Sequence, residues 1–350
     1  MGKHINIPLF IPQRGCPHTC IFCDQKKISG QSEPVSEKTL VDAVERHLAT
    51  AGPEDTVEIA FFGGSFTGLP KKDMLSYLQL AYSYVKEGKV TGIRVSTRPD
   101  YIDEEILDYL IAHEVKVVEL GVQSLDPDVL NISRRGHTVE DVERACRLIH
   151  KKGLTLGIQT MLGLPGDSIQ KALDTARGVI ALKPAMVRIY PALVLRETAL
   201  EQMMREGLYT PLSLTEAVTW SARIVPLYEQ ANIHILRLGL YAEQSLLSSV
   251  TEGPCHPAFG ELVASQILFE KICDRIEQEG LYKGKSLEIR VPQNMLSKVT
   301  GQHRSNIERL KQQYGFDRVQ VKTKEKGDDS EPVLDLFRRE ESGSFGGEAI

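Results

Sequence analysis

From residue 4 to residue 190 the sequence repeats one pattern, an apolar strand-like run followed by a loop and an amphipathic stretch. The predicted strands lie at 4–11, 56–62, 91–97, 115–121, 154–160 and 185–190. Strands that alternate with helices form parallel sheets with right-handed crossovers. The pattern therefore predicts an α/β fold in which six units form a partial (β/α)6 barrel, and a flat doubly wound sheet stays an alternative.

The stretches between the strands repeat apolar residues at three- and four-residue steps, as helices do. The first follows the N-cap Ser36 and carries Leu40, Val44 and Leu48 on one face. The other predicted helices lie at 74–85, 104–112, 139–149 and 169–182. Residues 196–232 are predicted to form two helices, the second at 214–230, and residues 233–240 form a further strand-like run.

Three of the six cysteines, Cys16, Cys20 and Cys23, lie in a loop directly after the first strand. In a β/α barrel, loops at the C-terminal ends of the strands carry the chemistry. The Cys-x3-Cys-x2-Cys spacing lets three thiolates face one soft metal centre. They are one ligand short of a closed zinc site and of a four-cysteine [4Fe–4S] site, so a cluster would keep one iron open. Zinc held with His18, or buried cysteines that bind nothing, remain alternatives.

Other strand ends carry glycine pairs or polar side chains. These segments are 61–68, 95–100, 119–124 and 159–166. A glycine pair alone indicates only a turn, and a single buried polar side chain is ordinarily structural. Because buried polar groups are costly unless they are hydrogen-bonded, four such strand ends in succession favour a polar ligand at the barrel mouth.

Together these motifs resemble those of the radical S-adenosylmethionine (SAM) enzymes. The cysteine spacing, with Phe22 before the third cysteine, is similar to their cluster signature, and Phe-Gly-Gly-Ser-Phe-Thr-Gly at 62–68 looks like their SAM-binding glycine motif. From about residue 7 to residue 265 the chain resembles the radical SAM core of the Elongator catalytic subunit, a tRNA wobble-uridine modifying enzyme. The motifs that carry this closer resemblance are 96–100, 119–124, 135–138, 188–191 and 253–263. Nothing in the sequence resembles that subunit's acetyltransferase domain, so acetyl transfer is not implied.

The resemblance implies two cofactors, a [4Fe–4S] cluster held by Cys16, Cys20 and Cys23, and SAM on its open iron. One electron would then cleave SAM to methionine and a 5′-deoxyadenosyl radical, and the donor would be a protein such as a flavodoxin or a ferredoxin. The residues that the resemblance assigns to SAM are Gly63, Gly64, Ser65, Thr67, Ser96, Arg98, Gln123, Leu162 and Gly163. No catalytic side chain is implied.

Residues 284–325 carry the second informative pattern. A strand is predicted at 287–292, a short helix at 293–300, a helix capped by Ser305 at 306–314, and a strand at 318–322. This β-α-loop-α-β order resembles the KH core, whose Gly-x-x-Gly loop grips a nucleic-acid backbone. In the corresponding loop here, Arg304 stands in place of the final glycine and puts a cation where phosphate would lie.

The charge of this region supports an interaction with a polyanion. Residues 283–326 hold eleven Lys and Arg against four Asp and Glu, a net charge of +7, whereas the remainder carries −12. A basic segment on an acidic chain is typical of nucleic-acid binding, although a solvated helix face is the simpler alternative. The predicted RNA-binding residues are Gly301, Gln302, His303, Arg304, Lys298 and Lys311.

The sequence therefore predicts a radical SAM enzyme that modifies tRNA or rRNA. Two alternatives stay open, a small-molecule oxidase of the coproporphyrinogen type and a non-catalytic RNA-binding iron–sulfur protein. Methylthiotransfer is disfavoured because the extra cysteine cluster of such enzymes is missing.

The predicted organisation is a barrel at 1–240, a helical extension packed on it at 241–283, the KH-like segment at 284–325 and a disordered tail at 326–350. No apolar run is long enough to predict a membrane span. Cys146, Cys255 and Cys273 are scattered, which gives no disulfide framework and favours the cytoplasm.

Overall fold

The computed structural model describes residues 2–11, 15–16, 20–24, 36–240, 244–281, 286–324 and 335–339. The chain forms two compact units, Met1–Pro257 (unit 1) and Ala258–Ile350 (unit 2). His18, which the zinc alternative requires, lies outside the described residues.

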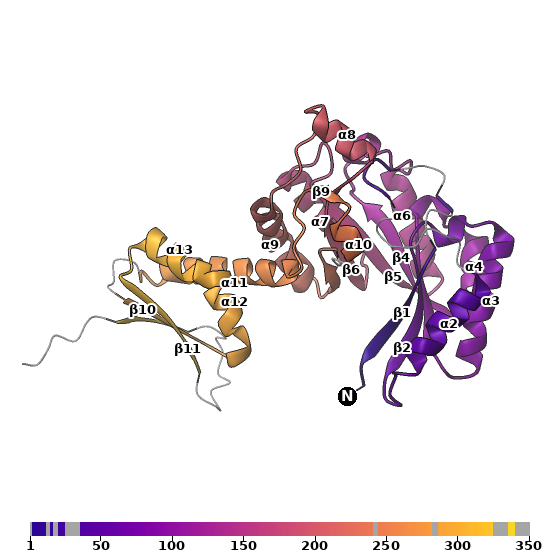
Figure 1. Ribbon diagram of the computed structural model, residues 1–350, viewed down its shortest axis with the longest axis horizontal. Helices are drawn as coiled ribbons and strands as arrows, with labels where there is room; N and C mark the ends of the chain where they lie inside the picture. The colour runs from indigo at the N-terminus through magenta and orange to yellow at the C-terminus, as the bar shows by residue number, and fades with distance from the viewer. Residues whose placement is uncertain are drawn as a thin grey trace, which may run out of the picture. The chain divides into compact units, whose positions relative to one another are not determined.

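Unit 1 is built on a seven-stranded parallel sheet in the order β1-β2-β3-β4-β5-β6-β8. Its strands are β1 (His4–Phe10), β2 (Thr56–Phe62), β3 (Gly92–Thr97), β4 (Val115–Gln123), β5 (Thr155–Leu162), β6 (Met186–Pro191) and β8 (His234–Leu238). The sheet curls into a half-barrel (Figure 1), which confirms the predicted partial barrel. The strand-like run at 233–240 becomes β8, the seventh strand, and pairs with β6.

Helices follow the strands and cover the outer face of the sheet (Figure 1). They are α2 (Glu37–Leu48), α3 (Lys71–Lys86), α4 (Glu104–Ala112), α5 (Pro127–Ile132), α6 (Val139–Lys151) and α7 (Ile169–Ala181). The predicted cap of α2 is confirmed, because Ser36 Oγ accepts a hydrogen bond from Thr39 N–H at 3.1 Å. Their apolar faces bury Leu40, Leu78, Leu107, Ile149 and Val179 against the sheet, so the opposite face of the sheet is left to form a site.

Beyond β6 the chain forms shorter elements of unit 1. These are β7 (Val194–Leu195), α8 (Ala199–Arg205), α9 (Leu214–Gln230), α10 (Gln244–Leu247) and β9 (Val250–Glu252), with β7 and β9 paired antiparallel. The two helices predicted between residues 196 and 232 are therefore present as α8 and α9.

Unit 2 packs helices on one face of a three-stranded sheet ordered β11-β10-β12 (Figure 1). Its elements are α11 (Phe259–Gln278), β10 (Ser286–Val291), α12 (Leu296–Thr300), α13 (Ser305–Tyr314), β11 (Arg318–Thr323) and β12 (Asp335–Arg339). β10 runs parallel to β11 and antiparallel to β12. The β-α-loop-α-β order predicted for the KH-like segment is present in β10, α12, α13 and β11.

Three details of unit 2 differ from the sequence prediction. The extension predicted to pack on the barrel at 241–283 is divided between the units. Residues 244–257 belong to unit 1, whereas α11 places Phe269, Ile272 and Ile276 in the core of unit 2, because its apolar face covers β10. Residues 335–339 of the expected tail form β12, and the rest of 326–350 lies outside the described residues. Ser305 does not cap α13 but begins it, since Arg304 at the N-cap position has a left-handed backbone.

Candidate functional site

A cavity of about 620 Å³ lies at the C-terminal ends of the unit 1 strands. Strands β1 to β6 and β8 all contribute to its wall, together with the cysteine loop. The lining includes Phe10, Cys16, Cys20, Cys23, Gly63, Gly64, Ser96, Arg98, Gly121, Gln123, Arg135, Gln159, Met161, Arg188, Tyr190 and Arg237. The structure therefore joins strand ends that are far apart in the sequence in one pocket.

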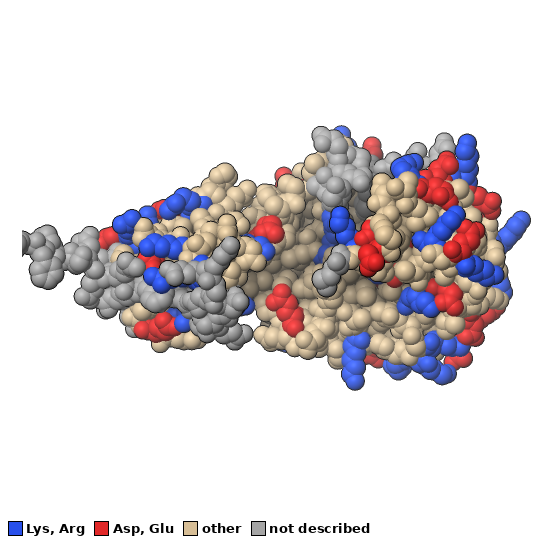
Figure 2. Space-filling view, turned by 90° about the horizontal axis from the view of Figure 1, so that it is seen from below, with Lys and Arg blue, Asp and Glu red and all other residues tan. Residues whose placement is uncertain are grey.

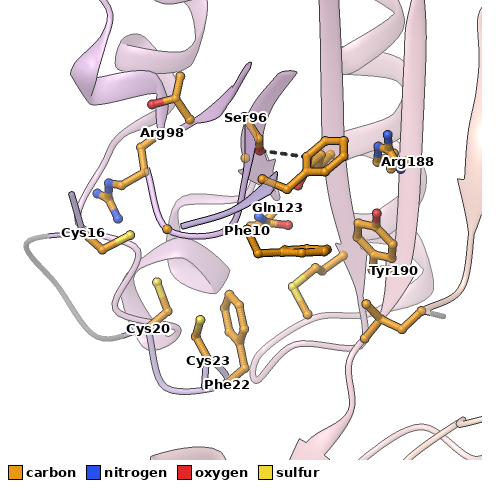
Figure 3. A pocket seen from close by; sticks show the side chains of 18 of the residues that line it. Phe10, Cys16, Cys20, Phe22, Cys23, Ser96, Arg98, Gln123, Arg188 and Tyr190 are labelled. Carbon is orange, nitrogen blue, oxygen red and sulfur yellow. Dashed lines mark hydrogen bonds between the residues drawn. The ribbon is translucent and has the colours of Figure 1, made fainter. Parts of the chain in front are cut away.

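The cysteine loop directs the sulfur atoms of Cys16, Cys20 and Cys23 into one end of this cavity (Figure 3). Ile21 anchors the loop, because its N–H donates to Ser133 O at 3.3 Å and its carbonyl accepts from Leu200 N–H at 2.9 Å. Within the described residues, no three His, Cys, Asp or Glu side chains are close enough to hold a single metal ion. A [4Fe–4S] cluster does not require three side chains around one ion, because each of its cysteines binds a different iron.

Gly15 and Gly68 bring the cysteine loop against the glycine-rich loop. A Cβ atom placed on Gly68 would lie 2.1 Å from Gly15 O, and one placed on Gly15 would lie 2.1 Å from Ser65 O. Neither position has space for a side chain, and Gly15 also has a left-handed φ of +75°. This close backbone approach fixes the start of the cysteine loop beside the second strand end.

Ser65 and Thr67 hold the glycine-rich loop from behind and are not among the described residues that line the cavity. Their hydroxyls lie 2.8 and 2.6 Å from Thr97 Oγ1. This buried hydroxyl cluster joins the end of β2 to the end of β3. The residues of the motif that line the cavity are Phe62, Gly63 and Gly64, and the two glycines have φ of 79° and 57°.

Arg98 and Gln123 each present an unpaired polar atom near the cavity. Two bonds of 2.9 Å tie Arg98 Nε and Nη2 to Asp100, whereas Nη1 has no partner among the described residues. Gln123 lies at an irregularity of β4 with a φ of 71°, and its Oε1 is also without a partner there. Buried polar atoms are rarely left unpaired, so these two atoms are candidates for binding a ligand.

Arg135 reaches the same place from the loop after α5. Its Nη1 lies 3.0 Å from Cys20 Sγ, and its Nη2 donates to Gly121 O at 2.5 Å. Burial, followed by the charges of Arg135 and Arg98, lowers the pKa of neighbouring His137 to about 3, so this ring is neutral. Arg135 belongs to a motif that carries the family resemblance, but no local pattern shows that it meets a residue 115 positions away.

A buried network of ion pairs crosses the inner face of the half-barrel. Arg94 donates to Glu58 at 2.7 Å and to Glu119 at 2.9 Å. Arg188 donates twice to Glu119, at 2.6 and 3.2 Å. Burial alone would raise the pKa of Glu119, but the hydrogen bonds and charges of Arg188 and Arg94 lower it below its ordinary value. Glu119 is therefore ionised and fixes Arg188 at the cavity wall.

Leu162 and Gly163, which the sequence assigned to SAM, are not among the described residues that line the cavity. Leu162 is buried in the core. The Gly163 N–H donates to Asp167 Oδ2 at 2.8 Å, and its carbonyl accepts from the Tyr209 hydroxyl at 2.7 Å. Gln159 and Met161 of β5 line the cavity instead.

We expect Asp167 to make the stability of unit 1 depend on pH. Burial raises the pKa of its carboxyl from 3.8 to about 6, although bonds from the Gly163 and Ser168 N–H groups oppose this shift. The folded state thus keeps a proton that the unfolded chain releases, and ionisation opposes folding. The contribution of the protonated Asp167 carboxyl to the free energy of unfolding is complete below the pKa of the unfolded chain. It is lost as the pH rises through about 6, the pKa in the folded state.

The variant Asp167→Asn removes this titration. Its unfolding free energy relative to the parent should rise between about pH 4 and about pH 7, as followed by the fluorescence of Trp220, the single tryptophan. A difference between the two proteins that stays constant over this range would contradict the assignment.

In unit 2 the predicted RNA-binding loop joins α12 to α13. Gly301, His303 and Arg304 have φ of 75°, 51° and 63°. Residues other than glycine rarely adopt such positive φ values. The side chains of Gln302, His303 and Arg304 are exposed. Strained backbone of this kind tends to occur where function requires it.

The base of this loop is held by buried polar contacts. Asn306 Nδ2 donates to Ser265 Oγ at 3.0 Å and to Val299 O at 3.2 Å.

Lys298 lies 3.8 Å from Glu261, and Lys311 lies 3.3 Å from Glu308. Partly exposed pairs of this kind are weak, so both lysines can exchange the carboxylate for a phosphate. Figure 2 shows lysine and arginine side chains over the visible face of unit 2.

Comparison with known proteins defines the class. The Radical SAM superfamily model matches residues 10–178, and the Radical_SAM C-terminal domain model matches residues 184–268. The chain belongs to the radical SAM superfamily. A [4Fe–4S] cluster and SAM are the cofactors of this family, which confirms the cofactors predicted from the sequence.

Within this superfamily the chain is similar to Elongator-type proteins. It is 31% identical over 221 residues to an uncharacterized protein of Methanocaldococcus jannaschii, covering 59% of this chain and 66% of that protein. It is 28% identical over 246 residues to the tRNA uridine(34) acetyltransferase of the same organism, covering 58% of this chain and 45% of that protein. Among solved structures, the archaeal Elp3 of Methanocaldococcus infernus with an N-terminal deletion aligns with a TM-score of 0.59 at 21% identity, over 80% of this chain and 64% of that one.

The chain thus spans 66% and 45% of the lengths of the two curated relatives named. The structural likeness to the archaeal protein shows a shared fold. No helix in the described part of the chain is long and apolar enough to cross a membrane.

Proposed function

We propose that this chain is a radical SAM enzyme that holds its cluster with Cys16, Cys20 and Cys23 and modifies RNA. The observation that carries the proposal is that these three thiols share one cavity with Gly63 and Gly64, at the C-terminal edge of a parallel half-barrel. When bound, the cluster and SAM supply reductive cleavage of SAM and hydrogen abstraction from an unactivated C–H bond. The residues of the chain would bind SAM, orient it and keep water away.

The unpaired atoms of the cavity suggest how SAM would be held. The backbone of Gly63 and Gly64 would receive its amino group, and Arg98 Nη1 would pair with its carboxylate. Gln123 Oε1 would accept a hydrogen bond from the ribose, with Ser96 beside it on the cavity wall. Ser65 and Thr67 would act indirectly through Thr97, and Leu162 and Gly163 would shape the end of β5.

The first test is SAM cleavage. Reduced, reconstituted protein should convert SAM to 5′-deoxyadenosine, and Gly64→Val should slow this reaction about 100-fold, since a side chain at a left-handed position displaces the backbone from SAM. The iron content of the variant should equal that of the parent. Gly88→Val is the matched control, because Gly88 also has a positive φ, of 69°, but has open space around it. Equal cleavage by the Gly64 and Gly88 variants would remove the glycine-rich loop from the site.

RNA is proposed as the target because residues 283–326 of unit 2 combine a KH-like element order with a net charge of +7 and an exposed, strained loop. Gly301, Gln302, His303 and Arg304 would contact the backbone of the RNA, with Lys298 and Lys311 nearby. Among RNA classes, tRNA is favoured, since a relative of this chain is named as a tRNA uridine(34) acetyltransferase.

Changing His303 and Arg304 together to Asp should weaken RNA binding by about tenfold or more, because a phosphate contact is lost and repulsion replaces it. Affinity of the parent should also fall steeply as the salt concentration rises. The control is Lys72→Asp with Gln79→Glu, which makes the same change in net charge at exposed positions of α3 in unit 1. Binding of tRNA is measured by filter retention or anisotropy. If the loop variant binds tRNA and rRNA as the control does, the small-molecule oxidase becomes the better reading.

A further inference from the structure

Arg135 is a buried cation beside the cysteine loop. The residue is 6% exposed, and its guanidinium lies within hydrogen-bond distance of Cys20 Sγ and Gly121 O. In the part of the chain that the structure describes, no carboxylate forms an ion pair with it. Removing a cation from water without an anionic partner is costly, so an arginine at this position requires a compensating negative charge.

The local backbone directs this side chain inward. After α5 ends at Ile132, the Arg135 N–H donates to Leu130 O at 3.0 Å. Arg134 and Gly136 have left-handed φ of 52° and 74°, so the chain turns sharply on both sides of Arg135. As a result Arg134 is exposed and Arg135 is buried. The turn therefore places Arg135, and not the adjacent Arg134, beside Cys20 of the cysteine loop.

Arg98 also lies near Cys16 (Figure 3), but its positive charge is paired with a carboxylate. Two hydrogen bonds of 2.9 Å to Asp100 balance its charge. Arg135 therefore supplies the positive charge beside the thiols that no described carboxylate offsets.

We propose that Arg135 is a positioning residue that stabilises the reduced state of the cluster through a charge-assisted hydrogen bond to Cys20 Sγ. The inference rests on the proposed cluster at Cys16, Cys20 and Cys23. Reduction adds one electron, and hence one negative charge, to the cluster and its thiolates, and no proton moves. A guanidinium beside a ligating sulfur interacts more strongly with the more negative state, so it raises the reduction potential. The electron comes from a low-potential one-electron donor of the flavodoxin or ferredoxin class, or from dithionite in vitro.

The test is a redox titration of the anaerobically reconstituted full chain without SAM, followed by electron paramagnetic resonance. For Arg135→Met we expect the equilibrium constant for one-electron reduction to fall about tenfold, a midpoint potential about 59 mV lower. Arg134→Met is the matched control, since it makes the same substitution at the adjacent exposed arginine, and its potential should equal that of the parent. A parent-like potential in Arg135→Met would overturn the inference.

Two further variants separate charge from packing and decide the matter if Arg135→Met loses its cluster. Arg135→Lys keeps the positive charge, whereas Arg135→Gln keeps hydrogen-bonding capacity without it. The potential of the Lys variant should lie above that of the Gln variant, and equal potentials would overturn the role of charge. A parent protein that takes up no cluster would instead refute the proposed function itself.

Discussion

Replacing Arg94 by Met is expected to lower the free energy of unfolding of unit 1 by about 3–5 kcal/mol. Arg94 is 2% exposed and pairs with both Glu58 and Glu119 in the inner face of the half-barrel. Among the described residues, its removal leaves the Glu58 carboxylate only the half-exposed His4 ring as a side-chain hydrogen-bond partner. Among the described residues it also leaves Arg188 as the one ion-pair partner of Glu119, so one positive charge no longer balances two buried carboxylates.

Chemical denaturation followed by Trp220 fluorescence measures this loss, because Trp220 lies in α9 of unit 1. Arg177→Met is the matched control, since it removes an exposed ion pair with Asp174 and should change stability by less than about 1 kcal/mol. Adding Glu58→Gln to Arg94→Met should recover part of the loss by removing the orphaned charge. If Arg94→Met is no less stable than Arg177→Met, the network does not hold the half-barrel together.

Much of the fold could be predicted because it follows from local pattern. The apolar runs at 56–62 and 115–121 became β2 and β4, and the Ser36 cap marked the start of α2. The partner of α11 could not be predicted in the same way. Its apolar face could cover the barrel or β10 equally well, and the choice depends on contacts made far along the chain.

The candidate site could be predicted where its residues belong to one contiguous motif. The cysteine loop, Gly63 and Gly64 were placed at the cavity by their position after strands. Ser65 and Thr67 belong to the same motif, yet their hydroxyls turn toward Thr97, which only the packing of β2 against β3 decides. Arg135 could not be assigned, since its contact with Cys20 depends on the turn after α5.

The start of α13 in unit 2 depends on a backbone conformation that the residue types do not predict. Ser305 is a good capping residue, so the sequence placed it before the helix. The structure gives His303 and Arg304 left-handed backbones, and α13 therefore begins one residue earlier than predicted. Positive φ values are unusual for residues other than glycine, and no propensity rule would have predicted them at His303 and Arg304.

The central claim is that Cys16, Cys20 and Cys23 bind a [4Fe–4S] cluster at the mouth of the half-barrel. Changing these three residues together to Ala should abolish iron binding, since no thiolate would then face the cavity from this loop. A matched control changes Cys146, Cys255 and Cys273 to Ala, because it removes the same number of thiols outside the loop.

The decisive measurement is the iron and sulfide content of anaerobically reconstituted protein. The parent and the control should each hold about four irons and about four sulfides per chain, and the loop variant essentially none. Iron retained by the loop variant, or a parent that holds only one zinc per chain, would contradict the account.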